Sequence, residues 1–208
     1  TAFGYGKLKS ELLGRWIRAR GVRDQVVIIA KGVHTPNCNP ESLTSQLVEQ
    51  LSWLGTDYAD IYLMHRDNPD IPAGEFIDVL NENVRAGRIK TFGGSNWSLE
   101  RVTRANAYAK RKGLQGLSII SNNLALAEMV TPVWGGCIHV HSAEDRVWLK
   151  KKQLALLPWS SQARGFFIPE RSRPDLRSDQ SLAKSWYSED NFKRQARTIE
   201  VAARYGVE

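Results

Sequence analysis

Two reactive side chains directly follow short apolar stretches of this sequence, and both side chains could transfer protons or bind a polar oxygen. Lys31 follows the stretch Val26–Ala30, and His65 follows Ala59–Met64. A lysine at the end of an apolar strand is costly to bury unless another group compensates its charge. Taken singly, Lys31 could equally reach the surface, and His65 could be a hydrogen-bonded core histidine.

Three further apolar stretches are followed by polar groups in the same way. They are Arg88–Phe92 before Gly93–Trp97, Leu117–Ile120 before Ser121–Asn123, and Leu154–Trp159 before Ser160–Gly165. If all five stretches are parallel strands, their polar residues meet at one rim, as in the active sites of β/α barrels. The joint pattern therefore indicates a functional site.

The elements between these stretches have helical signals. Asn39-Pro40-Glu41 predicts a helix start, and Leu43, Leu47, Leu51 and Leu54 continue it at helical spacing. Similar apolar stripes end at Gly87 and Gly113. Strands recurring about every thirty residues with helices between them predict an α/β fold with a parallel sheet. No glycine-rich dinucleotide fingerprint follows a strand, so a (β/α)8 TIM barrel is favoured over a Rossmann domain.

The last third of the chain differs. We expect one long loop from Phe167 to Ser188, because this region is rich in Pro, Ser and Arg and lacks periodicity. A last helix is predicted from Glu189 to Tyr205.

Composition excludes several classes of protein. The 208 residues carry a net charge of +7, but basic and acidic residues alternate along most of the chain, which favours a solvated surface over nucleic-acid binding. No apolar run approaches the roughly 18–20 residues that span a bilayer. The two cysteines, Cys38 and Cys137, lie far apart, so a disulfide framework is not expected and a reducing cytoplasm fits better.

Four blocks of the sequence, in order and spacing, resemble the aldo-keto reductase family of the bacterial type. They are Thr1–Gly6 with Ser10–Gly14, Ala30–Lys31, Asp57–His65, and Gly87–Lys90 with Ser95–Trp97. The resemblance implies an NAD(P)H-dependent oxidoreductase that reduces a small aldehyde or ketone, with Tyr5 as the general acid. A neighbouring Lys31 cation would lower the pKa of that phenol, and His65 would orient the substrate oxygen. The family's lysine pairs with an aspartate, which we expect immediately before Thr1.

The resemblance also implies a cofactor site. Ser95 and Asn96 correspond to the pair that binds the nicotinamide carboxamide, together with Ser121, for which Asn122 is the other candidate. Trp159 stands where the family stacks an aromatic ring on the nicotinamide, although it could instead be a core aromatic. Ser160, Gln162 and Arg164 would lie along the pyrophosphate. NADP(H) is the family's usual cofactor, and NAD(H) stays an alternative.

By this comparison the chain is one barrel domain over residues 1–208, truncated at both ends, with roughly five of eight strands. The missing strands would be those before Tyr5 and the last one. A barrel that lacks adjacent strands cannot close. We therefore expect the 208-residue chain, made alone, to be poorly soluble and inactive.

Cys137, His139 and His141 alternate in a loop and could in principle bind a metal, but no fourth ligand is near, so no metal is expected. These residues and Trp134 are expected to line the mouth of the substrate site.

A non-catalytic cofactor-binding subunit, like the β subunits of voltage-gated potassium channels, is the alternative function. A barrel enzyme acting on phosphorylated sugars would need its own phosphate loop, and none is found.

Overall fold

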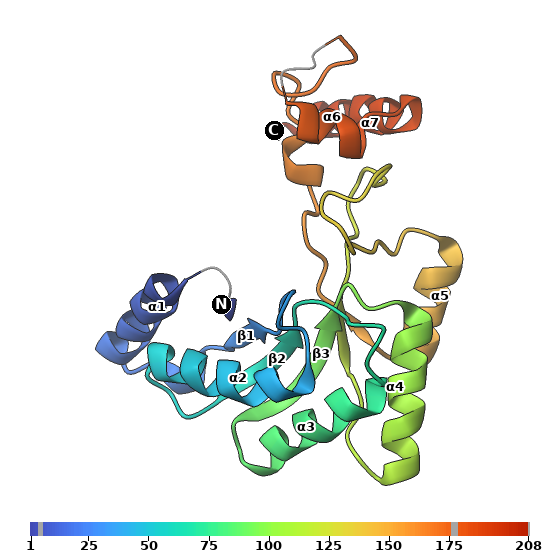
Figure 1. The fold of residues 1–208 in the computed structure, drawn as a ribbon. Helices are drawn as coiled ribbons and strands as arrows, with labels where there is room; N and C mark the ends of the chain where they lie inside the picture. The colour runs from blue at the N-terminus through green and yellow to red at the C-terminus, as the bar shows by residue number, and fades with distance from the viewer. Residues whose placement is uncertain (4–5, 176–178, 208) are drawn as a thin grey trace. The chain divides into compact units, whose positions relative to one another are not determined.

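The fold is built on a five-stranded parallel sheet whose strands follow one another in chain order (Figure 1). The computed structural model describes residues 1–3, 6–175 and 179–207. The strands are β1 (Ile29–Gly32), β2 (Ala59–Met64), β3 (Ile89–Ser95), β4 (Ile119–Ser121) and β5 (Ala155–Leu156). Each strand pairs in parallel with the next, as in a β/α barrel. The sheet is not closed, which agrees with the predicted incomplete barrel.

Helices alternate with these strands. They are α1 (Lys7–Arg20), α2 (Pro40–Leu54), α3 (Ala73–Arg85) and α4 (Leu99–Lys112), with a 3-10 turn at Arg23–Gln25, and α5 (Ala143–Lys152) precedes β5. Along the chain α1 packs on α2, α2 on α3 and α3 on α4, while α2 also contacts β1 and α3 contacts β3. The predicted apolar stripes of α2, α3 and α4 lie on the buried sides of these helices, since Leu43, Leu47, Phe76 and Val102 are fully buried.

The predicted helix boundaries follow from local capping chemistry. The Asn39 side chain accepts a hydrogen bond from the backbone N–H of Ser42 (2.8 Å), and Pro40 occupies the first turn of α2. Gly113 ends α4 in the left-handed conformation, with φ of 65°. These caps confirm the starts and stops that the sequence predicted.

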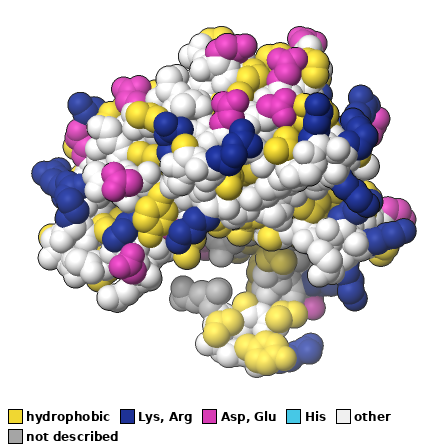
Figure 2. Space-filling model, turned by 90° about the horizontal axis from the view of Figure 1, so that it is seen from below, with side chains coloured by type: hydrophobic (Ala, Val, Ile, Leu, Met, Phe, Trp, Pro, Cys, Tyr) yellow, Lys and Arg dark blue, Asp and Glu magenta, His cyan; other side chains and the backbone are white. Residues whose placement is uncertain are grey.

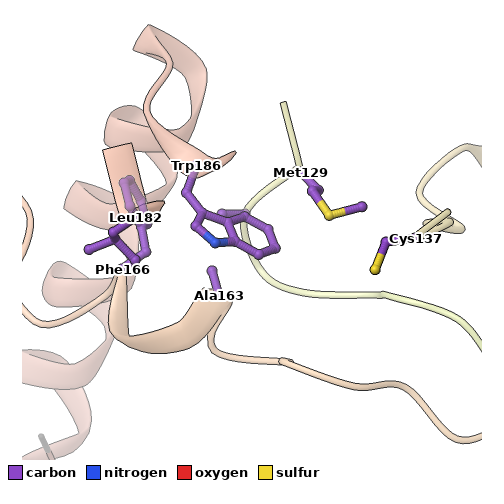
Figure 3. Close-up of a cluster of buried hydrophobic side chains, with 7 residues drawn as sticks. Met129, Cys137, Ala163, Phe166, Leu182 and Trp186 are labelled. Carbon is purple, nitrogen blue, oxygen red and sulfur yellow. The ribbon is translucent and has the colours of Figure 1, made fainter. Parts of the chain in front are cut away.

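Two compact units are distinguished within the chain. The first contains residues Thr1–Ser121 and Leu149–Leu157, and the second contains Asn122–Trp148 and Pro158–Glu208. The second unit holds a 3-10 turn (Ala163–Gly165), α6 (Gln180–Trp186) and α7 (Glu189–Tyr205). Its buried side chains surround the Trp186 ring and include Met129, Cys137, Ala163, Phe166 and Leu182 (Figure 3).

Several predicted boundaries were wrong. Lys31 is part of β1 instead of following it, and β3 extends through Gly93 and Gly94 to Ser95. Trp159 lies beyond the short β5 and pairs with Asn123 in an isolated bridge. Glycine and serine have low strand propensity, so the sequence underestimated β3.

The predicted loop from Phe167 to Ser188 was also wrong, because it contains α6. The Asp179 carboxylate caps this helix by accepting from the N–H of Leu182 (2.9 Å). Leu182, Ser185 and Trp186 form its buried face, and a serine in that face hides the apolar period. The sequence also gave no prediction of α1 or α5.

Charged side chains of both signs are interspersed on the face of the molecule in Figure 2. This mixture agrees with a solvated surface rather than a single basic patch. None of the described helices combines the length and the hydropathy that crossing a bilayer would require.

Asp60 joins the starts of three strands. Its carboxylate accepts from the N–H of Ile28 (2.9 Å) and pairs with Arg23 (3.1 Å) and Lys90 (2.7 Å). Burial works to raise the pKa of Asp60, but the hydrogen bonds from Lys90, Ile28 and Arg23 outweigh burial and hold that pKa below its usual range.

We expect Asp60→Asn to lower the free energy of unfolding of the full-length protein by about 1–3 kcal/mol at pH 7. Because the folded-state pKa is lowered, this stabilisation is present above the unfolded value of about 3.9 and is lost as the pH falls through the folded value. Urea unfolding at pH 7 and at low pH measures it. Glu100→Gln, in an exposed pair with Arg104, is the control and should change stability little. Equal stability of Asp60→Asn and wild type at neutral pH would contradict the assignment.

Candidate functional site

Ser95 joins the ends of three strands through its hydroxyl group. The Lys31 ammonium donates to Ser95 Oγ (3.3 Å), and the Asn96 side-chain amide donates to the same oxygen (3.2 Å). Ser95 in turn donates its proton to the backbone oxygen of Ser121 (2.8 Å). Since a hydroxyl has one proton, the oxygen can only accept from Lys31 and Asn96. The structure thus brings together four of the residues that the sequence singled out.

Burial shifts the protonation of Lys31 and His65. Burial, followed by the nearby Arg66 cation, lowers the pKa of Lys31 from 10.5 to about 8. The pKa of His65 falls from 6.5 to about 3 through burial first, then through electrostatic interaction with the Lys31, His34 and Arg66 side chains. His65 is therefore neutral at physiological pH, and it can exchange hydrogen bonds with a polar ligand without carrying charge.

The segment after His65 is fixed by two side chains from the β3–α4 region. The indole N–H of the fully buried Trp97 donates to the backbone oxygen of Arg66 (3.2 Å). Arg101 pairs with Asp67 (3.2 Å), and its guanidinium lies over the Trp97 ring at 5.2 Å. These supporting roles could not be predicted from the sequence, since they depend on backbone oxygens that only the fold brings near.

A cavity of about 380 Å³ lies beside His65. Its lining consists of Phe3, Gly32, His34, Thr35, Asn37, Gln46 and His65. Gln46 is nine-tenths buried, and its side-chain oxygen accepts from the N–H of Val33 (2.9 Å). The His34 ring packs edge-on against His65, with centroids 4.7 Å apart. Neither His34 nor Gln46 was predicted as a site residue, because His34 falls in a loop and Gln46 is a polar residue on the buried face of a helix.

The backbone around this end of the sheet is strained. Val33 has φ of 51° and Asn96 has φ of 60°. A positive φ is uncommon outside glycine, and for a β-branched residue such as Val33 it is an outlier. Such strain concentrates at functional sites, where the surrounding structure holds the residue in place.

In the second unit, Trp159 leads into a turn that contains the other predicted cofactor-binding residues. Ser160 and Arg164 have φ of 53° and 57°. Gln162 is right-handed, with φ of −99° and ψ of 24°, and Ala163 after it has φ of 48°. The Ala163 N–H donates to the Ser160 backbone oxygen (2.8 Å) and the Gly165 N–H to the Gln162 backbone oxygen (3.1 Å), so hydrogen bonds within the turn hold these left-handed residues. The Trp159 indole nitrogen is buried and has no hydrogen-bond partner among the described residues.

Tyr5 lies outside the described residues, so the structure does not place the predicted general acid. The described candidates fall in both units. Lys31, His65, Ser95, Asn96 and Ser121 belong to the first, whereas Trp159, Ser160, Gln162 and Arg164 belong to the second.

The alternating Cys137, His139 and His141 do not form a metal site in the structure. The two histidine rings lie 5.0 Å apart, while Cys137 is buried in the core of the second unit. In the part of the chain that the structure describes, no group of three or more His, Cys, Asp or Glu side chains could hold a metal ion.

Comparison with known proteins gives one consistent result. The sequence model described as the Aldo/keto reductase family matches residues 1–208. Aldo-keto reductase YhdN of Bacillus subtilis is 31% identical over 121 residues, which cover 55% of this chain and 36% of that protein. Aldo-keto reductase yakc [NADP(+)] of Schizosaccharomyces pombe is 29% identical over 114 residues, covering 50% of this chain and 33% of that protein. The chain therefore matches about a third of the length of these relatives.

A solved structure shares the fold. The crystal structure of a protein assigned as a 2,5-diketo-D-gluconic acid reductase B superposes with a TM-score of 0.62 at 22% sequence identity. The match covers 79% of this chain and 52% of that one.

In the wild type, the hydrogen bond from the Lys31 ammonium to Ser95 Oγ stabilises the charged form of the lysine. We therefore expect Ser95→Ala, which removes this bond, to lower the pKa of Lys31 below its value of about 8. NMR titration of isotopically methylated lysines in the full-length protein, without cofactor, measures this pKa. Ser118→Ala is the matched control, since the Ser118 hydroxyl bonds Thr91 and Phe92 instead. An unchanged Lys31 titration in Ser95→Ala would show that the hydrogen bond is not formed in solution.

Proposed function

Because the chain belongs to the aldo/keto reductase family, we propose that the protein containing it reduces an aldehyde or ketone to the alcohol, with hydride from a nicotinamide cofactor. The observation that carries this proposal is the pairing of a neutral His65 with a lysine of lowered pKa, which the structure places at the ends of neighbouring strands. Perturbed titratable groups beside a cavity are typical of a catalytic site.

The three proposed catalytic residues divide the work on the carbonyl oxygen. The cofactor, when bound, supplies hydride to the carbonyl carbon. Tyr5 donates its phenolic proton to the oxygen, and the resulting phenolate is stabilised by the Lys31 cation. A neutral His65 donates a hydrogen bond to the same oxygen and orients it. The role of Tyr5 rests on the family resemblance, whereas those of Lys31 and His65 are also supported by their protonation states.

The proposed cofactor-binding residues offer the groups that a dinucleotide needs. Ser95, Asn96 and Ser121 offer polar groups for a carboxamide, and Trp159 offers a flat ring for stacking. In the turn that holds Ser160 and Gln162, Arg164 offers a cation for a pyrophosphate. We propose NADP(H) as the cofactor, supported by the relative named for NADP(+). NAD(H) is the alternative.

The proposal extends to the whole protein. The partner is a small carbonyl compound that enters the cavity beside His65, where Phe3 offers an aromatic surface and Asn37 and Gln46 offer uncharged polar groups. We propose that residues 1–208 form part of a single cytoplasmic barrel domain.

Steady-state assays of the full-length protein with NADPH and 4-nitrobenzaldehyde should show turnover. Tyr5→Phe should lower kcat by about 10²–10⁴-fold, because it removes the proton donor and leaves the ring. NADPH binding, followed by Trp fluorescence, should persist in this variant. Tyr205→Phe, at a tyrosine that is 75% exposed, is the control and should keep full activity.

Two results would contradict the proposal. Binding of NADPH without turnover of any aldehyde would favour a non-catalytic subunit of the same fold. Full activity of Tyr5→Phe would remove Tyr5 from the mechanism.

A further inference from the structure

We propose that Trp134 is a cofactor-binding residue of the second unit, and that its indole and the Arg164 guanidinium together cover a nucleotide held beside Trp159. This inference rests on the proposed function, since it assigns one more residue to the same cofactor. The family resemblance gave Trp134 no such role.

Trp134 is a large aromatic side chain that the fold leaves half uncovered. Its exposed fraction is 51%, although burying an indole would release more free energy than burying most other side chains. Its ring centroid lies 6.1 Å from that of Trp159, with an angle of 46° between the planes. Two indoles thus stand next to each other without stacking fully, and one face remains accessible.

Asn123 fixes this pair of rings. Asn123 is fully buried, and its side-chain amide donates to the backbone oxygen of Trp159 (2.8 Å). Its own backbone N–H and oxygen bond Ile138 and Val140 (both 2.9 Å), which belong to the loop that carries Trp134. A single residue therefore holds both segments, so the position of Trp134 beside Trp159 follows from the backbone.

The loop is anchored on one side of Trp134 and open on the other. The Cys137 N–H donates to the Trp134 backbone oxygen (3.1 Å), and Cys137 is buried in the core of the unit (Figure 3). Between them, Gly136 has φ of 72°, and a Cβ placed at Gly135 or Gly136 would contact nothing within 4 Å. The turn that presents Trp134 therefore projects into open space, where a ligand can reach the ring.

Arg164 supplies a cation at the same place. Its guanidinium carbon lies 5.1 Å above the Trp134 ring, and one nitrogen donates to Ser181 Oγ (3.2 Å). Arg164 forms no ion pair with any carboxylate in the described ranges. Its charge is therefore held in position and is available to an anion.

A ligand that uses all of these groups must combine a flat ring with a negative charge. The ring would pack against the indoles, and the negative charge would meet the Arg164 guanidinium. A nucleotide with its phosphates has this chemistry. A neutral aromatic compound would leave Arg164 unused, and inorganic phosphate would leave both indoles unused.

The test measures NADPH binding by the full-length protein, without any carbonyl substrate. Trp134→Ala should raise the Kd for NADPH about 5- to 30-fold, mainly through faster dissociation in stopped-flow fluorescence. Trp134→Phe keeps an aromatic ring and should restore most of the affinity. Trp16→Ala is the matched control, because Trp16 is also half exposed (44%) and lies under an arginine, Arg20, at 4.8 Å, but belongs to α1 of the first unit.

The outcomes separate the inference from the proposed function. If wild type and Trp16→Ala bind NADPH equally, Trp134→Ala binds it more weakly and Trp134→Phe restores most of the affinity, the inference holds. If Trp134→Ala has the wild-type Kd and dissociation rate, the inference is overturned while the function stands. If Trp134→Phe is as weak as Trp134→Ala despite an unchanged Tm, stacking is not the interaction, which also overturns the inference. Failure of wild type itself to bind NADPH would reject the proposed function.

Discussion

The ammonium group of Lys31 constrains the first unit, because a charge at the end of an apolar strand must be compensated nearby. Among the described residues, the compensation is a hydrogen bond from Lys31 to Ser95 Oγ, and Ser95 is itself bonded to the backbone of Ser121. The carboxyl ends of β1, β3 and β4 must therefore lie level with one another for Lys31 to remain partly buried. The parallel register of β1 with β2 and of β2 with β3 provides this alignment. The same burial lowers the pKa values of Lys31 and His65, on which their proposed catalytic roles depend.

The segments beyond the strand ends share this dependence on precise backbone placement. Val33 and Asn96 adopt left-handed conformations directly after β1 and β3, and Ser160 and Arg164 do so in the turn after Trp159. Each such residue costs free energy that the surrounding packing must offset. Gln46, which bonds the N–H of Val33, and Trp97, which bonds the oxygen of Arg66, show how the fold supplies this support. The rigid sheet and the strained turns therefore act together to present polar groups.

Much of this arrangement could be predicted from the sequence, because its signals are local. The Asn39-Pro40 start of α2, the full extent of α7 and the five strands in order all follow from caps and from apolar periodicity. The grouping of Lys31, Ser95, Asn96 and Ser121 follows from the rule that parallel strands end at one rim.

The remainder could not be predicted, because it depends on contacts between residues distant in sequence. Arg101 and Trp97 support the segment after His65 through backbone oxygens, and no motif marks such partners. Helix α6 could not be predicted from apolar periodicity, because Leu182 and Trp186 are the large apolar residues on its buried face and serine and lysine residues occupy neighbouring positions. From the sequence, Trp134 is an aromatic residue in a loop. Its position beside Trp159 depends on hydrogen bonds of Asn123 to both segments.

The account's central claim is that burial and neighbouring cations keep His65 neutral beside Lys31. NMR titration of the His65 imidazole in the full-length protein, without cofactor, tests this claim most directly. We predict a neutral ring down to about pH 4, consistent with a pKa of about 3, and a higher pKa in Lys31→Met, where one cation is removed. A His65 that titrates at its ordinary value of 6.5, and whose pKa is the same in Lys31→Met, would contradict the account.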